Sequence, residues 1–323
     1  MLNPLLGLTA ATLVVALNAA GTAIAQTYPD KLVRFVVAFS PGGATDIGAR
    51  VIAAYLTRTF GQQVYVENKS GATGMIGSEA AARSPADGYT VLIAPDSLVS
   101  NAHVFKMKIA PLTDLVPVIQ LSRQPIVLAA HGSLGVDSLA QLVALAKQRP
   151  GMSYASGAGA GSPQHMVVQW FAQLAGIKLD HVPYRGGGQA ITDLIAGHVK
   201  IGSLGSSPLM PYYNAGTLRL LAQSTEARSP SLPHVPTYQE AGIMGLVLDQ
   251  WLGVFVPAGT PHSVITRLNT EMNKALADQA VRENFMQSAQ EPVGGTAEQF
   301  SHLVQQDFER YARLVKELNI TAN

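Results

Sequence analysis

The sequence predicts an α/β protein with two lobes joined by two crossing strands and a ligand cleft between them. The first hundred residues repeat a strand, a loop and a helix, which is typical of a mainly parallel sheet covered by helices. A second strand, glycine loop and helix occupy 152–175. Residues 115–130 are two apolar extended segments around a polar break at 120–125, and 246–255 is extended again. They suit a chain that leaves one lobe and later returns to it.

Residues 1–25 are expected to be a signal peptide. An apolar stretch is followed by Ala23-Ile24-Ala25, an A-x-A cleavage pattern, although no Lys or Arg precedes it. Cleavage near Gln26 would place the mature protein in the periplasm. The lobes are expected at 26–124 with 250–323 for the first and at 125–249 for the second.

Composition excludes several functions. The formal net charge of the 323 residues is +1 and no cluster of Lys and Arg with aromatics occurs, so nucleic acid is not an expected partner. Because the chain has no cysteine, disulfides, zinc–thiolate sites and thiol catalysis are excluded. The eight histidines show no metal-ligand spacing. No metal and no cofactor is expected.

The first strand, turn and helix lie around Pro41-Gly42-Gly43. The apolar run 35–39 predicts a buried strand, and apolar residues from Ile47 to Phe60 recur at helical spacing until Gly61. Free N–H groups of Thr45, Asp46 and Ile47 at the helix start would suit an anion. The alternative is that the glycines only form a turn and Asp46 only caps the helix.

Further elements follow from the same periodicities and turn residues. Strands are expected at 63–68, 89–94, 152–155, 181–184, 199–204 and 218–223, and helices at 75–83, 138–147, 165–175, 189–196, from Thr260-Pro261 (N-cap and first residue), at 280–290, and from the capping box Thr296-Ala297-Glu298-Gln299 onward.

No catalytic motif is found. Ser156 and Ser162 lack the G-x-S-x-G pattern of a nucleophile elbow. Ser162 and His165 are close enough to touch, but no third group orients the histidine, so a capping serine is the favoured interpretation. The loop Gly157–Ser162 has neither a P-loop Lys nor the G-x-G-x-x-G register. Serines, threonines and glycine N–H groups at strand ends suit the binding of a small anion.

An ordered set of short motifs resembles the Bug (TctC-type) extracytoplasmic solute receptors of tripartite tricarboxylate transporters. The resemblance covers nearly all of the mature chain. The motifs are Pro41-Gly42-Gly43-Ala44-Thr45-Asp46, Val66-Glu67-Asn68, Pro85-Ala86-Asp87-Gly88-Tyr89, Tyr154-Ala155-Ser156, His181-Val182-Pro183-Tyr184-Arg185-Gly186, Ala215-Gly216-Thr217-Leu218-Arg219, Val256-Pro257-Ala258-Gly259-Thr260-Pro261 and Glu291-Pro292-Val293-Gly294.

This resemblance implies a type II periplasmic-binding fold, a carboxylate ligand and delivery to a membrane permease of two integral subunits. The residues it implicates in ligand binding are Phe39, Ser40, Gly43, Thr45 and Asp46 of the first lobe, and Ser156, Gly157, Ser162, His165 and Tyr184 of the second. Asp46 would orient water or cap the helix, because it would otherwise repel a carboxylate.

Two loops depart from the family pattern. Pro95-Asp96-Ser97 stands where small hydroxyl residues are usual, and the loop with Ser203 lacks the usual aromatic and acidic residues. Both should line the far end of the pocket. Asp96 would either select a ligand with an amino group or cap the next helix.

The leading hypothesis is a non-enzymatic, monomeric periplasmic receptor for a small carboxylate that closes by a hinge motion. A receptor that signals to a sensor protein is an alternative that the sequence does not separate from it. An exported α/β hydrolase that uses Ser162 and His165 is the third hypothesis.

Overall fold

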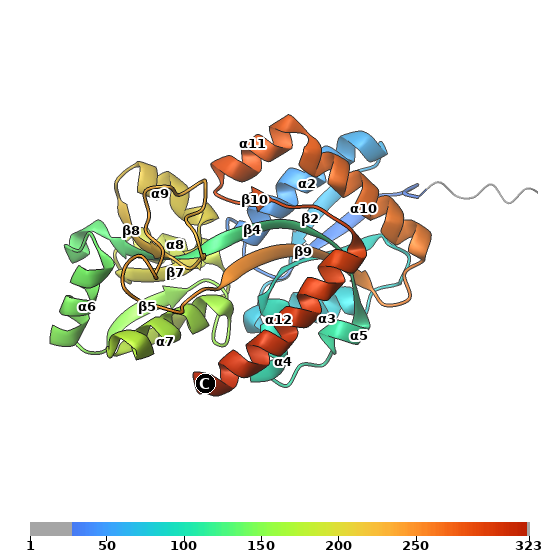
Figure 1. Ribbon diagram of the computed structural model, residues 1–323. Helices are drawn as coiled ribbons and strands as arrows, with labels where there is room; N and C mark the ends of the chain where they lie inside the picture. Colours follow the sequence, from blue (N-terminus) through green and yellow to red (C-terminus); the bar gives the residue numbers. More distant parts are fainter. Residues whose placement is uncertain (1–27, 322–323) are drawn as a thin grey trace, which may run out of the picture.

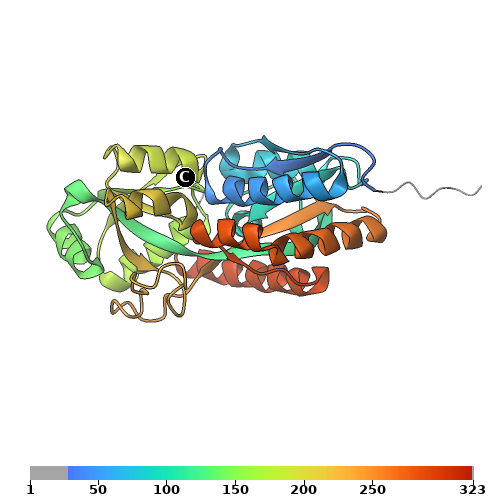
Figure 2. The same ribbon diagram turned by 90° about the horizontal axis from the view of Figure 1, so that it is seen from above.

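The computed structural model describes residues 28–321, and the predicted signal peptide lies outside this range. Two α/β halves lie side by side, and the green strand β4 runs from one into the other (Figures 1 and 2). We keep the names first lobe and second lobe for the ranges defined above. No helix within 28–321 combines the length and apolar character needed to cross a membrane.

The sheet of the first lobe has the strand order β2-β1-β3-β9-β4, in which β1 pairs in parallel with both β2 and β3. The elements from β1 to α5 are β1 (Val33–Val37), α2 (Ala44–Phe60), β2 (Val64–Asn68), η3 (Ala72–Gly74), α3 (Met75–Ala82), β3 (Thr90–Pro95), α4 (Ser97–Val104) and α5 (Pro111–Asp114). Helix α2 ends before Gly61, as predicted, and Gly61 adopts the left-handed conformation.

The second lobe repeats this arrangement, with β5 between β7 and β6 and parallel to both. Its elements are η4 (Gly132–Leu134), α6 (Leu139–Gln148), β5 (Met152–Ser156), α7 (Pro163–Ala175), β6 (Leu179–Pro183), α8 (Gly187–Ile195), β7 (Ile201–Gly205), η5 (Ser207–Leu209), α9 (Met210–Asn214) and β8 (Leu218–Gln223). The parallel pairing places the loops after β5, β6 and β7 at one edge of the sheet.

Strand β4 (Leu115–His131) belongs to both sheets. Its first part pairs with β9 (Asp249–Pro257), and residues from 126 onward pair with β7 and β8. The two extended segments expected at 115–130 form one continuous strand, with register shifts between Pro117 and Ile119 and between Gln120 and Ser122. The expected strand at 246–255 begins three residues later.

The C-terminal helices belong to the first lobe. They are α10 (His262–Ala277), α11 (Gln279–Gln287) and α12 (Ala297–Glu317), with the short β10 (Glu291–Pro292) between the last two. Helix α12 lies across β4 and against α4 (Figure 1). Both hydrogen bonds of the predicted capping box at its start are present. The expected cap at Thr260 is wrong, because its hydroxyl donates to the Pro257 carbonyl and Pro261 is the N-cap residue.

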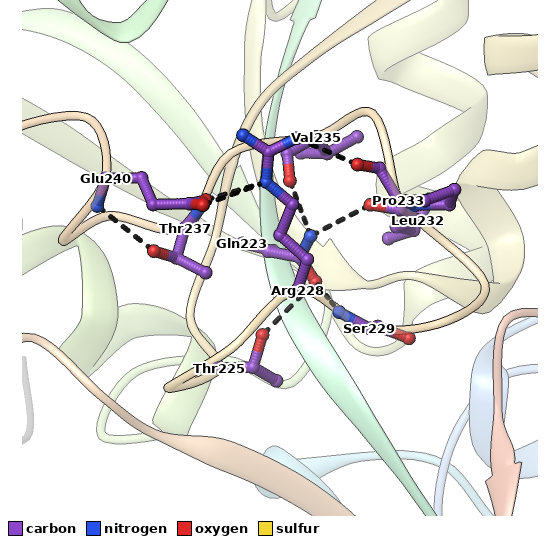
Figure 3. A network of polar contacts seen from close by, with 9 residues as sticks. All are labelled: Gln223, Thr225, Arg228, Ser229, Leu232, Pro233, Val235, Thr237 and Glu240. Carbon is purple, nitrogen blue, oxygen red and sulfur yellow. Dashed lines mark hydrogen bonds and ion pairs between the residues drawn. The ribbon is translucent and has the colours of Figure 1, made fainter.

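The buried side chain of Gln223 contributes several of the hydrogen bonds that hold the long connection between β8 and β9 (Figure 3). Its amide nitrogen donates to the carbonyls of Leu232 and Val235 at 3.0 and 2.6 Å, and its oxygen accepts from the Ser229 N–H at 2.9 Å. Arg228 forms an ion pair with Glu240 at the surface of the same loop. The loop therefore has a fixed path without regular secondary structure.

Candidate functional site

A small cavity of about 30 Å³ lies between the lobes, and we call it the interlobe cavity. Its lining comes from the loop after β1, the end of β3, the start of β9 and the loops after β5, β6 and β7. The lining residues are Phe39, Gly43, Ala44, Thr45, Pro95, Gly157, Ala158, Gln164, Gly187, Leu204, Gly205, Pro208 and Gln250. This volume holds about two water molecules.

Three helices present their N-terminal turns to this cavity: α2 through Ala44 and Thr45, α7 through Gln164, and α8 through Gly187. The first N–H groups of a helix have no intrahelical acceptor, and the helix dipole is positive at that end. The expectation that the Ile47 N–H is free is wrong, since it donates to the Gly43 carbonyl at 3.0 Å. The remaining N–H groups make the cavity suited to an anion.

The two lobes touch through backbone at this point. Across the lobes, a Cβ atom added at Gly188 would lie 2.0 Å from the Pro41 carbonyl oxygen, and within the second lobe one added at Gly157 would lie 2.6 Å from Gly187 Cα. Real side chains do not tolerate such distances. Glycine at these positions is therefore what allows peptide groups to line the cavity directly.

Ser40 and Tyr184 lie at a wider opening beside the interlobe cavity. This opening has a volume of about 650 Å³ and is also lined by residues of α8. Ser40 is only 6% exposed, and its buried hydroxyl has no hydrogen-bond partner. The Tyr184 hydroxyl donates to the Asp193 carboxylate at 2.6 Å. Ser40 is thus a buried hydroxyl with unused hydrogen-bonding capacity beside this opening.

Asp46 stabilises the turn before α2. Its carboxylate accepts hydrogen bonds from the Gly42 N–H at 3.0 Å, from Arg50 at 2.9 Å and from Asn68 at 2.9 Å. Burial alone would raise the pKa of Asp46, but these hydrogen bonds outweigh it and hold the pKa below its usual value. The side chain is thereby ionised, paired and occupied with the turn.

Two glutamines connect the cavity to the interior. Gln164 accepts from the Gly157 N–H at 2.8 Å and donates to Gln250 at 3.4 Å. Gln250 in turn donates to Asp96 at 3.3 Å. Asp96 is fully buried, accepts from the Tyr311 hydroxyl at 2.7 Å and makes no side-chain capping bond to α4. Asp96 therefore lies behind Gln250 and does not line the cavity.

Two stacked imidazoles lie beneath the loop after β5. His165 and His181 are 4.1 Å apart between ring centroids, and the Gly161 N–H donates to His165 Nδ1. Burial lowers the pKa of His165 to about 4, and burial together with the charge on His165 lowers the pKa of His181 to about 3. Both rings are neutral at neutral pH.

Comparison with known proteins identifies the family. A family model described as tripartite tricarboxylate transporter family receptor (TctC) matches residues 48–320. The chain belongs to this family. It is 37% identical to the protein BugT of Bordetella pertussis over 297 residues, which cover 91% of each chain. It is also 37% identical, over 92% of its length and 89% of the relative, to a protein of Pseudomonas sp. strain P51 known as the UPF0065 protein in the tcbD-tcbE intergenic region.

Solved structures of similar proteins share the fold of this TctC family receptor. Rpa4515 of Rhodopseudomonas palustris, solved with adipate, has a TM-score of 0.88 and 34% identity over 91% of this chain and 99% of its own. MatC of the same species, with bound malate, has a TM-score of 0.84 and 27% identity over 89% and 100% of the two chains. The fold is that of the periplasmic binding proteins. Members of the family are solute receptors and not enzymes, so the hydrolase hypothesis is wrong.

The structure places the predicted residues of this TctC family receptor in three groups. Phe39, Gly43, Thr45 and Gly157 line the interlobe cavity, and Ser40 and Tyr184 lie at the opening beside it. The others are buried behind these surfaces. They are Asp46, Asp96, Ser97, Ser156, Ser162, His165 and Ser203. A contact with the ligand stays a prediction for all of these residues.

The buried hydroxyls are used by the fold itself. Ser162 accepts from the His165 N–H as the N-cap of α7 and donates to the Gly159 carbonyl. Ser156 lies 2.7 Å from His181 Nε2, and Ser203 donates to the Gln164 carbonyl. The Ser162 hydroxyl therefore does not bond the His165 imidazole, which agrees with the favoured interpretation of Ser162 as a cap.

Sequence reasoning did not select Gln164, Gln250, Gly187 or Pro208, although all four line the cavity. Gln164 follows the loop Gly157–Ser162 and begins a helix, which is a usable signal. Gln250 gives no such signal in the sequence, because its role depends on which face of β9 is turned toward the cavity. Within residues 28–321, no three His, Cys, Asp or Glu side chains are grouped so as to hold a metal ion.

Proposed function

We propose that this protein is a periplasmic receptor that binds a small carboxylate in the interlobe cavity and delivers it to a permease. The observation that carries the proposal is the meeting of three helix N-termini, from both lobes, at one cavity. A carboxylate there would accept hydrogen bonds from N–H groups of both lobes. It would thereby favour the closed arrangement of the lobes.

The ligand class is supported by the similar proteins. One of them was solved with adipate and another with malate, both dicarboxylates. The unpartnered hydroxyl of Ser40 lies where a second polar group of such a ligand would enter. Predicted ligand contacts are the residues of the cavity and its opening, with Asp46 supporting the turn.

Binding requires the lobes to separate. The cavity has room for about two waters, so a ligand with several carbon atoms enters only if the contact between Gly43 and Gly187 opens. The bend would fall where β4 passes from one sheet to the other and where β9 begins.

The partner and compartment follow from the family. Receptors of this class serve a tripartite tricarboxylate transporter, so delivery to a permease of two integral subunits is the proposed next step. The predicted signal peptide and the periplasmic relatives support a periplasmic location. The receptor is proposed to act as a monomer.

The test is a thermal-shift screen of residues 26–323 against mono-, di- and tricarboxylates, acidic amino acids and aromatic acids, followed by calorimetry. A ligand at a hundredfold its Kd stabilises the folded state by about 2.7 kcal/mol, so a rise of a few degrees in Tm is expected. The absence of any shift across the panel, for protein freed of bound ligand by unfolding and refolding, would overturn the proposal.

A variant pair locates the site. Gly43→Glu places a carboxylate against Gly187 and should abolish binding of every hit. Ala54→Glu adds the same charge to the exposed side of the same helix and should leave the Kd within about twofold. Unchanged binding by Gly43→Glu would place the site elsewhere.

A further inference from the structure

A chain of hydrogen bonds runs from the cavity to a buried carboxyl group. The Gly157 N–H donates to Gln164 Oε1 at 2.8 Å, Gln164 Nε2 donates to Gln250 Oε1 at 3.4 Å, and Gln250 Nε2 donates to Asp96 Oδ1 at 3.3 Å. The other oxygen of Asp96 accepts from the Tyr311 hydroxyl at 2.7 Å. Every member named is buried, and the chain joins the second lobe to the first.

All donors in this chain point toward Asp96. A carboxylate only accepts hydrogen bonds, so it turns the NH₂ group of Gln250 toward itself. Gln250 must then present oxygen to Gln164, and Gln164 presents oxygen to the Gly157 N–H. The consequence at the cavity is that one backbone donor is occupied and an amide oxygen stands where an anion would bind.

The surroundings of Asp96 favour its neutral form. Burial, together with the charge on Asp307, raises the pKa of Asp96 to about 8 against the opposing hydrogen bonds from Tyr311, Gln250 and the Ser97 N–H. The groups that face the carboxyl group are Tyr311 and Asp307 of α12, Gln250 of β9 and the N–H of Ser97. Arg310 lies 3.9 Å from Asp307.

We propose that Asp96 is a positioning residue whose protonation reverses the hydrogen-bond chain, so that carboxylate binding is coupled to the uptake of one proton from solvent. This inference rests on the proposed function. The protonated carboxyl group donates to Gln250 Oε1, Gln250 donates to Gln164 Oε1, and the Gln164 NH₂ group and the Gly157 N–H are left facing the cavity. A bound carboxylate accepts from both.

The reversal breaks only long contacts elsewhere. Gln124 donates to Gln250 Oε1 at 3.3 Å and accepts from Ser206 and Ser207 at 3.4 Å. Electrostatics acts in the same direction as the hydrogen bonds, because a bound anion repels a charged Asp96 and stabilises the neutral one. Affinity should therefore be greatest where Asp96 is protonated.

The first measurement needs no ligand. In ¹H–¹⁵N spectra of the ligand-free mature protein, the Gly157 resonance should shift with a midpoint near pH 8 between pH 6 and 9.5. It should stay constant in Asp96→Asn, whose amide mimics the protonated acid by donating to Gln250 and accepting from Tyr311. In Gln250→Leu the carboxyl carbon of Asp96 should still titrate while Gly157 does not respond.

The second measurement is calorimetry with adipate and malate, which stay ionised over this range. Above the midpoint the Kd of the wild type should rise by up to tenfold per pH unit, whereas that of Asp96→Asn should change by less than twofold. Tyr311→Phe removes a donor to the carboxylate, so its rise in Kd should begin at higher pH.

A Gly157 resonance that does not titrate, or that titrates equally in Asp96→Asn, would overturn the inference. So would equal pH dependence of the Kd in both proteins. A different outcome would count against the proposed function instead: no carboxylate binds at any pH, while Gly157 still follows Asp96.

Discussion

At the scale of single residues, polar side chains near the cavity differ in whether the fold already uses them. The hydroxyls of Ser156, Ser162 and Ser203 bond backbone carbonyls or an imidazole, while the Ser40 hydroxyl has no partner. An unpartnered buried donor loses its water without compensation. Ser40 is consequently the hydroxyl with most to gain from a ligand.

The lowered pKa of His165 makes the free energy of unfolding depend on pH. The unfolded chain takes up a proton near pH 6.5 and native His165 only near 4, so the unfolding free energy falls as the pH is lowered through this window. His165→Asn keeps an acceptor for the Gly161 N–H and removes this titration. Urea unfolding should therefore show that the wild type loses about 2 kcal/mol more than the variant between pH 7 and 4.5. Equal losses would contradict this assignment.

At the scale of elements, the helix N-termini at the cavity and the loop between β8 and β9 have different roles. Helices α2, α7 and α8 bring their N-termini to the cavity because each follows a parallel strand directly, and parallel strands end at one edge of a sheet. The loop between β8 and β9 has one isolated β-bridge, between Gln223 and Thr237, and no regular strand or helix. The Gln223 side chain adds three hydrogen bonds to backbone groups of this loop (Figure 3).

Gln223→Leu should destabilise the protein by about 3 kcal/mol, since it leaves two carbonyls and one N–H of the loop without their partner. Denaturant unfolding measures this loss, and limited proteolysis should cut the loop faster. Arg228→Ala removes an exposed ion pair in the same loop and should cost less than about 1 kcal/mol. Comparable losses in the two variants would show that Gln223 does not hold the loop.

At the scale of the whole molecule, the two lobes share the crossing strands and meet at a boundary that we call the seam. Gln290 is fully buried and donates both to the Ala44 carbonyl of the first lobe and to Ser207 of the second. Ser206 donates to the Ala289 carbonyl. These bonds lie along the seam, whereas the contact between Gly43 and Gly187 lies across the cavity.

A reversible disulfide between the lobes tests whether they must separate before ligand binds. The chain has no cysteine, and a Cβ added at Gly43 would lie 3.5 Å from Gly187 Cα, so cysteines at these two positions would be neighbours across the cavity. The Gly43→Cys/Gly187→Cys variant, oxidised in the closed form, should bind no carboxylate in calorimetry. Reduction should restore binding, and each single variant should bind in both redox states. Equal affinity before and after reduction would mean that ligand enters without separation of the lobes.

Much of the fold could be predicted from the sequence because its signals are local. These signals involve residues only a few positions apart. They are the strand and helix periods, Gly61 at the end of α2 and the capping box at Thr296. The ordered motifs identified the family, and the family model matches residues 48–320. Four of the predicted site residues line the cavity, since they lie in the loops or first helical turns that follow strands.

Only the tertiary structure decided which side chains meet. Gln124 and Gln250 are 126 residues apart, and Asp96 and Tyr311 are 215 apart, so no local pattern reports their contacts. Thr260 fits a cap in sequence, yet its hydroxyl bonds Pro257 instead. Asp96 follows a strand like a ligand-binding residue and is instead buried behind Gln250. The sequence determined the secondary-structure elements and the family because both depend on short segments of the chain. The identity of the cavity's polar groups depended on long-range packing, which turns Gln250 of the crossing strand β9 toward the cavity.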